Sequence, residues 1–150
     1  MKVTFEFDYK DLDMFNKKCQ ATVRNVGTGT KKATTEACKE ILEASLAQVP
    51  KDTYTLAMSA FYSVYRRTDT SGNSYKYEGI VGYGGKGDPI NPKTGRAASD
   101  YMVAVHEDLT APHRNGKAKF LEDPVREYGK DNFARTVFKY ASESLAEMNK

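Results

Sequence analysis

Both histidines of the chain lie in one segment, YMVAVHEDLTAPHRNGKAKFLEDP at residues 101–124. His106 stands directly before the acidic pair Glu107 and Asp108, and His113 follows seven positions after His106. Imidazole and carboxylate groups are ligands of catalytic zinc ions, and they also act as general acids and bases. One hypothesis is therefore a metal-dependent hydrolase that uses His106, Glu107 and His113.

The spacing of the two histidines does not match the common zinc-hydrolase pattern. In the HExxH motif, two histidines four residues apart lie on one face of a helix. Thr110 occupies that position after His106. The other interpretation is that His106 ends an apolar segment and forms local hydrogen bonds, while His113 lies in a polar turn. We favour this second interpretation, so no metal site is predicted.

Other sequence motifs of catalysis are missing. The glycine-rich stretch GYGGKGD departs twice from a phosphate-binding Walker loop, because Ile80 replaces the first glycine and Gly87 replaces the serine or threonine. There is no GxSxG motif. Cys19 and Cys38 fall in predicted helices, outside any CxxC pattern, and are expected to be buried free thiols. We therefore expect neither an enzyme nor a bound cofactor.

The size and charge of the chain predict one globular domain covering residues 1–150. This length is enough to bury a core. A formal net charge of +3 and a pI of about 8.7 fall short of the basic surface expected of a dedicated nucleic-acid binder. No apolar run approaches the roughly 20 residues of a membrane span. The N-terminal MKVTFEFDYKD lacks the apolar core of a secretory signal, so we expect synthesis in the cytoplasm.

The first third of the chain predicts one strand and two helices. KVTFEF at 2–7 alternates as a half-buried strand does. A helix is predicted over 9–25, and Gly27 is expected to end it. A second helix is predicted over 28–50, with Pro50 closing it. The apolar stripe of the first helix consists of Leu12, Phe15, Cys19 and Val23.

The rest of the chain predicts a hairpin followed by a long helix. Runs typical of strands at 60–67 and 75–84 flank the turn sequence TDTSGNS. Residues 84–100 have no pattern, and such long loops are usually functional or disordered. Residues 101–107 fit either a strand or a buried helix. A helix with Asp123 as its cap and Pro124 in its first turn is predicted over 125–149, with a kink or break near Gly129.

The order of these elements predicts an α+β fold. Its antiparallel sheet contains a β-hairpin, which packs against two N-terminal helices and a long C-terminal helix. Tyrosines are concentrated in the hairpin, and tyrosine is enriched at protein interfaces because it combines a large apolar area with a polar tip. Ordinary packing between neighbouring strands explains these tyrosines equally well.

The histidine segment and its continuation, YMVAVHEDLTAPHRNGKAKFLEDPVRE, resemble the tail-completion and minor capsid (neck) proteins of long-tailed bacteriophages. The shared features are an aromatic–apolar run ending in valine, an acidic corner, a Phe-Leu pair and a proline that opens the last helix. The matching positions are Tyr101, Val105, His106, Glu107, His113, Gly116, Ala118, Lys119, Phe120, Leu121 and Pro124. VPKDTYTLAMSAF resembles the family's passage from the second helix to the first hairpin strand, at Pro50, Leu56 and Ser59.

This resemblance implies a structural virion protein without an enzymatic step. It implies a helical layer on an antiparallel sheet, and assembly into a homo-oligomeric ring, a hexamer or a dodecamer, at the head–tail junction or the tail end. The ring would contact other phage neck and tail proteins, and it could touch passing DNA without sequence specificity. Neither a cofactor nor a membrane contact is implied.

The expected partner interface combines the hairpin, the 84–100 loop and the histidine segment. Loops on a rigid scaffold are where contact residues are usually carried. The candidate residues are Tyr75, Tyr77, Lys86, Asp88, Arg96, His106, Glu107, His113 and Arg114.

Overall fold

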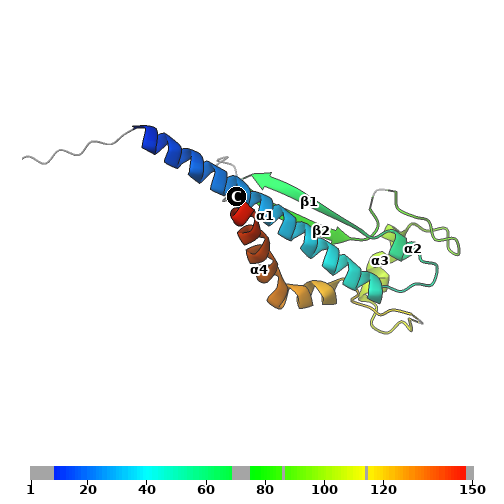
Figure 1. Cartoon of the computed structure of the whole chain (residues 1–150). Helices are drawn as coiled ribbons and strands as arrows, with labels where there is room; N and C mark the ends of the chain where they lie inside the picture. Colours follow the sequence, from blue (N-terminus) through cyan, green and yellow to red (C-terminus); the bar gives the residue numbers. More distant parts are fainter. Residues whose placement is uncertain (1–8, 69–74, 86, 114, 148–150) are drawn as a thin grey trace, which may run out of the picture.

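The computed structural model describes residues 9–68, 75–85, 87–113 and 115–147, and it confirms the α+β class (Figure 1). Its elements are, in chain order, α1 (Tyr9–Gln48), α2 (Thr55–Met58), β1 (Phe61–Thr68), β2 (Tyr75–Gly82), α3 (Ala98–Glu107) and α4 (Glu122–Ala146). The strand predicted at 2–7 lies outside the described residues. Within those ranges, no helix is both long and apolar enough to cross a membrane.

Helix α1 runs without interruption from Tyr9 to Gln48, so the helix end predicted at Gly27 is wrong and the two predicted N-terminal helices are one. Gly27 and Gly29 are both buried. A Cβ atom added to Gly29 would lie 2.4 Å from the backbone oxygen of Tyr140 and 2.8 Å from the Cα atom of Ala141, both in α4. Gly29 therefore lets two helix backbones approach closely, and this packing outweighs the weak helix propensity of glycine.

Threonine side chains bond to the backbone of α1 around these glycines. Each donates its hydroxyl to the carbonyl oxygen four residues earlier, at 2.9 to 3.1 Å, and these residues are Thr22, Thr28, Thr30, Thr34 and Thr35. Such bonds satisfy the hydroxyl within the helix but bend helices slightly. Because threonine and glycine are also poor helix formers, this stretch is intrinsically the weakest part of α1.

The predicted hairpin is confirmed, because β1 and β2 form a two-stranded antiparallel sheet. The strands pair from Phe61 with Gly82 at one end to Thr68 with Tyr75 at the other. The turn between them lies outside the described residues. The hairpin lies alongside α1 (Figure 1), so the fold has a helical layer on one side of a narrow sheet.

The contact between α1 and the sheet is close at Gly79. A Cβ atom added there would lie 2.4 Å from the Sγ atom of Cys38. Cys38 is buried as predicted, and burial raises the pKa of its thiol. Cys19 is exposed, so the prediction that it is buried is wrong. The reason is that the part of α1 around Cys19 does not pack on the body of the fold.

The main core lies where α1 ends. The residues buried together there are Val49, Leu56, Tyr83, Ala98 and Phe120. The rings of Tyr83 and Phe120 meet edge to face, with centroids 5.1 Å apart. The hydroxyl of Tyr83 lies 2.6 Å from the Oγ atom of Ser45 in α1, which gives the core one internal polar contact. Burial raises the pKa of Tyr83 and outweighs the opposing effect of this bond.

Residues 101–107 belong to helix α3, which decides between the strand and the helix that the sequence left open. The loop before α3 is held by hydrogen bonds. The backbone N–H of Asn91 donates to the carbonyl oxygen of Arg96 at 2.8 Å. The Oδ2 atom of Asp88 accepts a 2.9 Å bond from the backbone N–H of Ser99, in the first turn of α3. Asp88 thereby satisfies one of the N–H groups that the start of a helix leaves without a partner.

Helix α4 begins at Glu122, so Asp123 lies inside the helix and the prediction that it is the cap is wrong. The carboxylate of Asp123 pairs instead with Lys117 at 2.6 Å. Pro124 lies in the first turn, as predicted. The helix is unbroken at Gly129, and it changes direction in its orange part (Figure 1). Its red end lies against the middle of α1.

Candidate functional site

The end of α3 and the start of α4 meet in a corner built around His106. Its Nε2 atom accepts a 3.3 Å bond from the backbone N–H of Glu122, and its Nδ1 atom lies 2.7 Å from Oε1 of Glu107. Because Nε2 accepts, Nδ1 carries the proton and donates to Glu107. The imidazole also packs edge to face on Phe120, with ring centroids 4.9 Å apart. The local bonding predicted for His106 is confirmed, and it caps the first turn of α4.

Lys119 holds the same corner from the loop side. Its φ of 56° is uncommon for a residue other than glycine, and its N–H donates to the carbonyl oxygen of His106 at 2.8 Å. Its ammonium pairs with Glu107 and, at 2.9 Å, with Glu122. The bond from Lys119, followed by that from His106, holds the pKa of Glu107 below its ordinary value. The bonds to Glu107 and then Glu122 raise the pKa of Lys119, so both groups stay charged at neutral pH.

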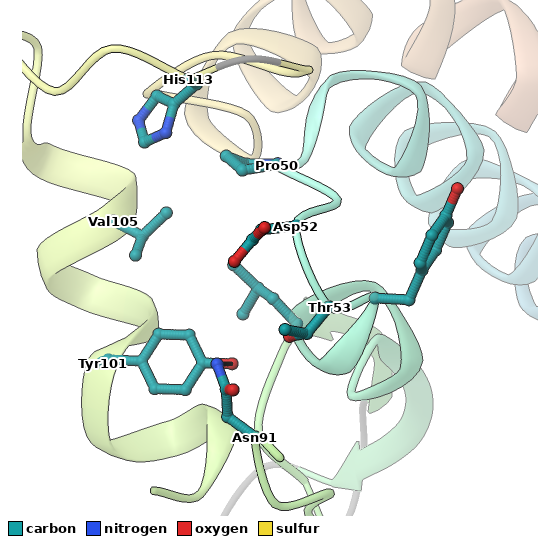
Figure 2. Close-up of a pocket in the computed structure, with 9 residues that line it drawn as sticks. Pro50, Asp52, Thr53, Asn91, Tyr101, Val105 and His113 are labelled. Atoms are coloured by element: carbon teal, nitrogen blue, oxygen red, sulfur yellow. Dashed lines mark hydrogen bonds between the residues drawn. The ribbon is translucent and has the colours of Figure 1, made fainter. Parts of the chain in front are cut away.

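A cavity of about 250 Å³ on another face of α3 contains the second histidine (Figure 2). Tyr101 and Val105 of α3 form one wall, and Asp52 and Thr53 face them from the segment after α1. His113 lies at one end of this cavity. Its Nε2 atom is buried and has no hydrogen-bond partner among the described residues. The cavity therefore combines an apolar wall, a polar wall and one unsatisfied imidazole nitrogen.

Other polar groups of this cavity already have partners within the fold. Asp52 pairs with Lys93 at 2.8 Å, and the amide of Asn91 lies 3.5 Å from the hydroxyl of Tyr101. Within the part of the chain that the structure describes, no three His, Cys, Asp or Glu side chains are placed to hold a metal ion. The hydrolase hypothesis gains no support from these residues.

The predicted interface residues lie in separate places. They are found in β2 (Tyr75 and Tyr77), in the loop before α3 (Asp88 and Arg96), in the corner (His106 and Glu107) and at the cavity (His113). Lys86 and Arg114 lie outside the described residues. The guanidinium of Arg96 donates to the backbone oxygen of Asp100 at 2.8 Å, so Arg96 and Asp88 both bond to α3. The structure joins His106 and Glu107 directly, and it shows Asp88 and Arg96 supporting one helix.

Sequence reasoning missed a surface on the N-terminal part of α1, residues 9–26, which we call the arm. Residues 12–20 are all exposed, and the first buried residue described in α1 is Gly27. The blue end of α1 extends beyond the rest of the fold (Figure 1). Leu12, Phe15 and Val23 are 50%, 66% and 59% exposed. The stripe was visible in the sequence, but its spacing alone cannot tell whether the partner lies in the same chain.

An apolar groove of about 310 Å³ lies between the hairpin and α3. Its main lining residues are Phe61, Val81, Tyr83, Met102, Val103 and Phe120. Val103 is 60% exposed, while Tyr83 and Phe120 are buried, so the groove runs from the surface to the core. Glu107, with its Lys119 partner, lies at the same groove and gives it a charged edge. This arrangement suits the binding of an apolar side chain.

Comparisons of the chain with protein-family models, with curated proteins and with solved structures find no match. The resemblance to phage tail-completion and minor capsid proteins therefore rests on residues 101–127 and 49–61 of this sequence. Membership of this family stays a prediction.

Proposed function

We propose that the chain is a structural subunit of a long-tailed bacteriophage virion, which assembles into a homo-oligomeric ring at the neck or the tail end without a catalytic step. The observation that carries this proposal is the apolar arm, which stands outside the folded body. The resemblance of residues 101–124 to tail-completion and minor capsid proteins supplies the virion context. A hexamer or a dodecamer in contact with other neck and tail proteins is part of the same proposal.

The arm favours an assembly function for a physical reason. Most of the stability of a helix in a protein comes from tertiary packing of its apolar face. Contiguous apolar surface left exposed on one subunit usually marks a site of protein interaction. Leu12, Phe15 and Val23 are each at least half exposed in a helix of otherwise polar character. Covering them by another subunit would stabilise the arm and the assembly together.

The corner around His106 supports a structural role for the histidine segment. Its two ring nitrogens are engaged by Glu107 and by the backbone of Glu122. Use of Nε2 for proton transfer or metal binding would break the contact between α3 and α4, and use of Nδ1 would break the bond to Glu107 within α3. These bonds are instead suited to holding the two helices in a fixed arrangement, as an assembly subunit requires.

Light scattering coupled to size exclusion, with negative-stain imaging of the same fractions, tests this proposal. The purified chain is expected to form particles larger than its 16.8 kDa monomer, with ring-shaped images. Phe15→Asp should abolish the assembly, because it places a charge on the apolar stripe. Met14→Asp is the matched control, since Met14 is 55% exposed on the same arm but lies off the stripe. A wild-type chain that stays monomeric at every concentration would contradict the proposal.

A further inference from the structure

The arm and the apolar groove lie at opposite ends of one molecule. Tyr83 and Phe120 of the groove pack against Val49, just after the end of α1. At a rise of about 1.5 Å per residue, Phe15 and Gln48 are about 50 Å apart along α1. Because α1 is one continuous helix, the arm cannot fold back into the groove of its own chain.

We propose that the arm of one copy docks into the apolar groove of the next copy, so that subunits join head to tail. This inference rests on the proposed function, because head-to-tail docking and ring assembly both require copies of this chain to associate. The occupant of the groove is the stripe of residues 12–23 from the second copy, with Phe15 as its anchor. Such a contact uses two different surfaces of each subunit, and it forms a ring when the rotation between neighbours closes.

The anchor and the groove match in chemistry. Among the large apolar side chains of the arm that the structure describes, Phe15 is the most exposed, at 66%. The groove is lined mainly by aromatic and aliphatic side chains, and its volume of about 310 Å³ suits an anchoring side chain rather than a whole helix. Aromatic residues that enter a pocket on the partner carry much of the binding energy at protein interfaces.

The two segments that supply the contact carry opposite formal charges. Residues 9–24 hold four basic and two acidic side chains, which gives the arm a formal charge of +2. Residues 98–128, the segment that contributes Met102, Val103, Glu107 and Phe120 to the groove, hold four basic and six acidic side chains, a formal charge of −2. Opposite charges steer the arm toward the groove, and like charges disfavour pairing between two arms.

Cys19 provides a site for thiol crosslinking in the arm, because it is exposed and lies one turn from Phe15. Cys38 is buried, so it is expected not to react. Two full-length proteins are mixed under assembly conditions: the wild-type chain, and a tagged chain with Cys19→Ser and Ala104→Cys. Ala104 is exposed and adjoins Val103 of the groove. A short crosslinker between thiols is added, and the products are identified by mass. The expected product joins one wild-type chain to one tagged chain.

The other outcomes of this experiment each overturn the proposal. A product that joins two wild-type chains would show arm-to-arm pairing, and one that joins two tagged chains would show groove-to-groove pairing. Association without the mixed product would leave the ring-forming function in place and move its contact to another surface. If light scattering shows no association, the proposed function fails together with the docking.

A pair of substitutions tests the groove without relying on crosslinks. Val103→Asp introduces a charge into the groove and should weaken association by about tenfold or more. Leu109→Asp is the matched control, because Leu109 is 75% exposed and does not line the groove. Circular dichroism checks that both variants fold. Equal weakening by the two variants, or none by Val103→Asp, would contradict docking at this groove.

Discussion

Replacing Gly29 by alanine tests the contact that joins α1 to α4. The added Cβ atom would lie 2.4 Å from the backbone oxygen of Tyr140, whereas an ordinary contact needs 3.4 Å or more. The helices must therefore move apart by roughly 1 Å, which gives up close packing along their contact. Overpacking costs about 1–3 kcal/mol, and alanine returns about 1 kcal/mol through its better helix propensity. Because the obstructing atoms belong to backbone, we expect a net loss of about 1–2 kcal/mol.

The matched control is Gly129→Ala in α4, where an added Cβ atom would meet nothing within 4 Å. Only the propensity gain remains there, so this variant should be more stable than wild type by about 1 kcal/mol. Urea unfolding followed by circular dichroism measures both free energies of unfolding, and the two changes should have opposite signs. A Gly29→Ala variant as stable as Gly129→Ala would refute the close backbone contact between α1 and α4.

Three further predictions concern single contacts. Asp88→Ala should lower the free energy of unfolding by about 1 kcal/mol, because it removes a bond at the start of α3, and Asp88→Asn should retain most of it in thermal melts. Tyr83→Phe should cost about 1–3 kcal/mol, because it leaves the hydroxyl of Ser45 buried without its partner. Adding Ser45→Ala should recover part of this loss in urea titrations, and strict additivity would argue against a direct bond. Glu107, whose pKa is lowered by Lys119, stabilises the fold above its unfolded-state pKa and loses this contribution as the pH falls through its folded-state value. The stability difference between wild type and Glu107→Gln, measured by urea titration, should therefore shrink as the pH falls below the ordinary glutamate pKa of about 4.3 and vanish below the lower folded-state pKa, and a difference that does not shrink in acid would contradict the pairing.

Local sequence signals predicted the elements whose structure depends on neighbours in the chain. The β-branched and aromatic residues at 60–67 and 75–84 and the turn residues between them predict a hairpin without help from the rest of the fold. The apolar stripes after residue 28 and after Pro124 likewise match α1 and α4. The short run at 101–107 did not predict its own structure, because a pattern of only seven residues fits a strand and a helix equally well.

The errors occur where distant contacts override local preference. Gly27 looks like a helix end because glycine favours the left-handed conformation found there, yet α1 continues through it, and Gly29 two residues later packs closely on α4. Asp123 looks like a cap, but its carboxylate forms an ion pair with Lys117. The acceptor for the first backbone N–H of α4 is the Nε2 atom of His106. No local pattern could reveal that acceptor, since His106 and Glu122 are 16 residues apart and meet through the turn at Lys119.

The candidate surfaces also differ in whether they depend on neighbours in the sequence or on distant contacts. The bond between His106 and Glu107 joins neighbours in sequence and could be expected. The groove could not, because it needs the hairpin, α3 and the Phe-Leu pair to come together in space. The arm is an intermediate case. Its stripe was evident, but exposure depends on how far α4 reaches along α1, which the sequence does not state.

The threonine- and glycine-containing stretch of α1 has a mechanical consequence. It extends from Thr22 to Thr35, so it covers the end of the arm and the contact of Gly29 with α4, and the bending stiffness of α1 is lowest near the point where the arm leaves the folded body. A tilt of about 10° there would displace the tip of an arm about 27 Å long by about 5 Å. Small differences in the angle between neighbouring copies would then be absorbed as elastic bending of one helix, and the surfaces that touch would stay in register.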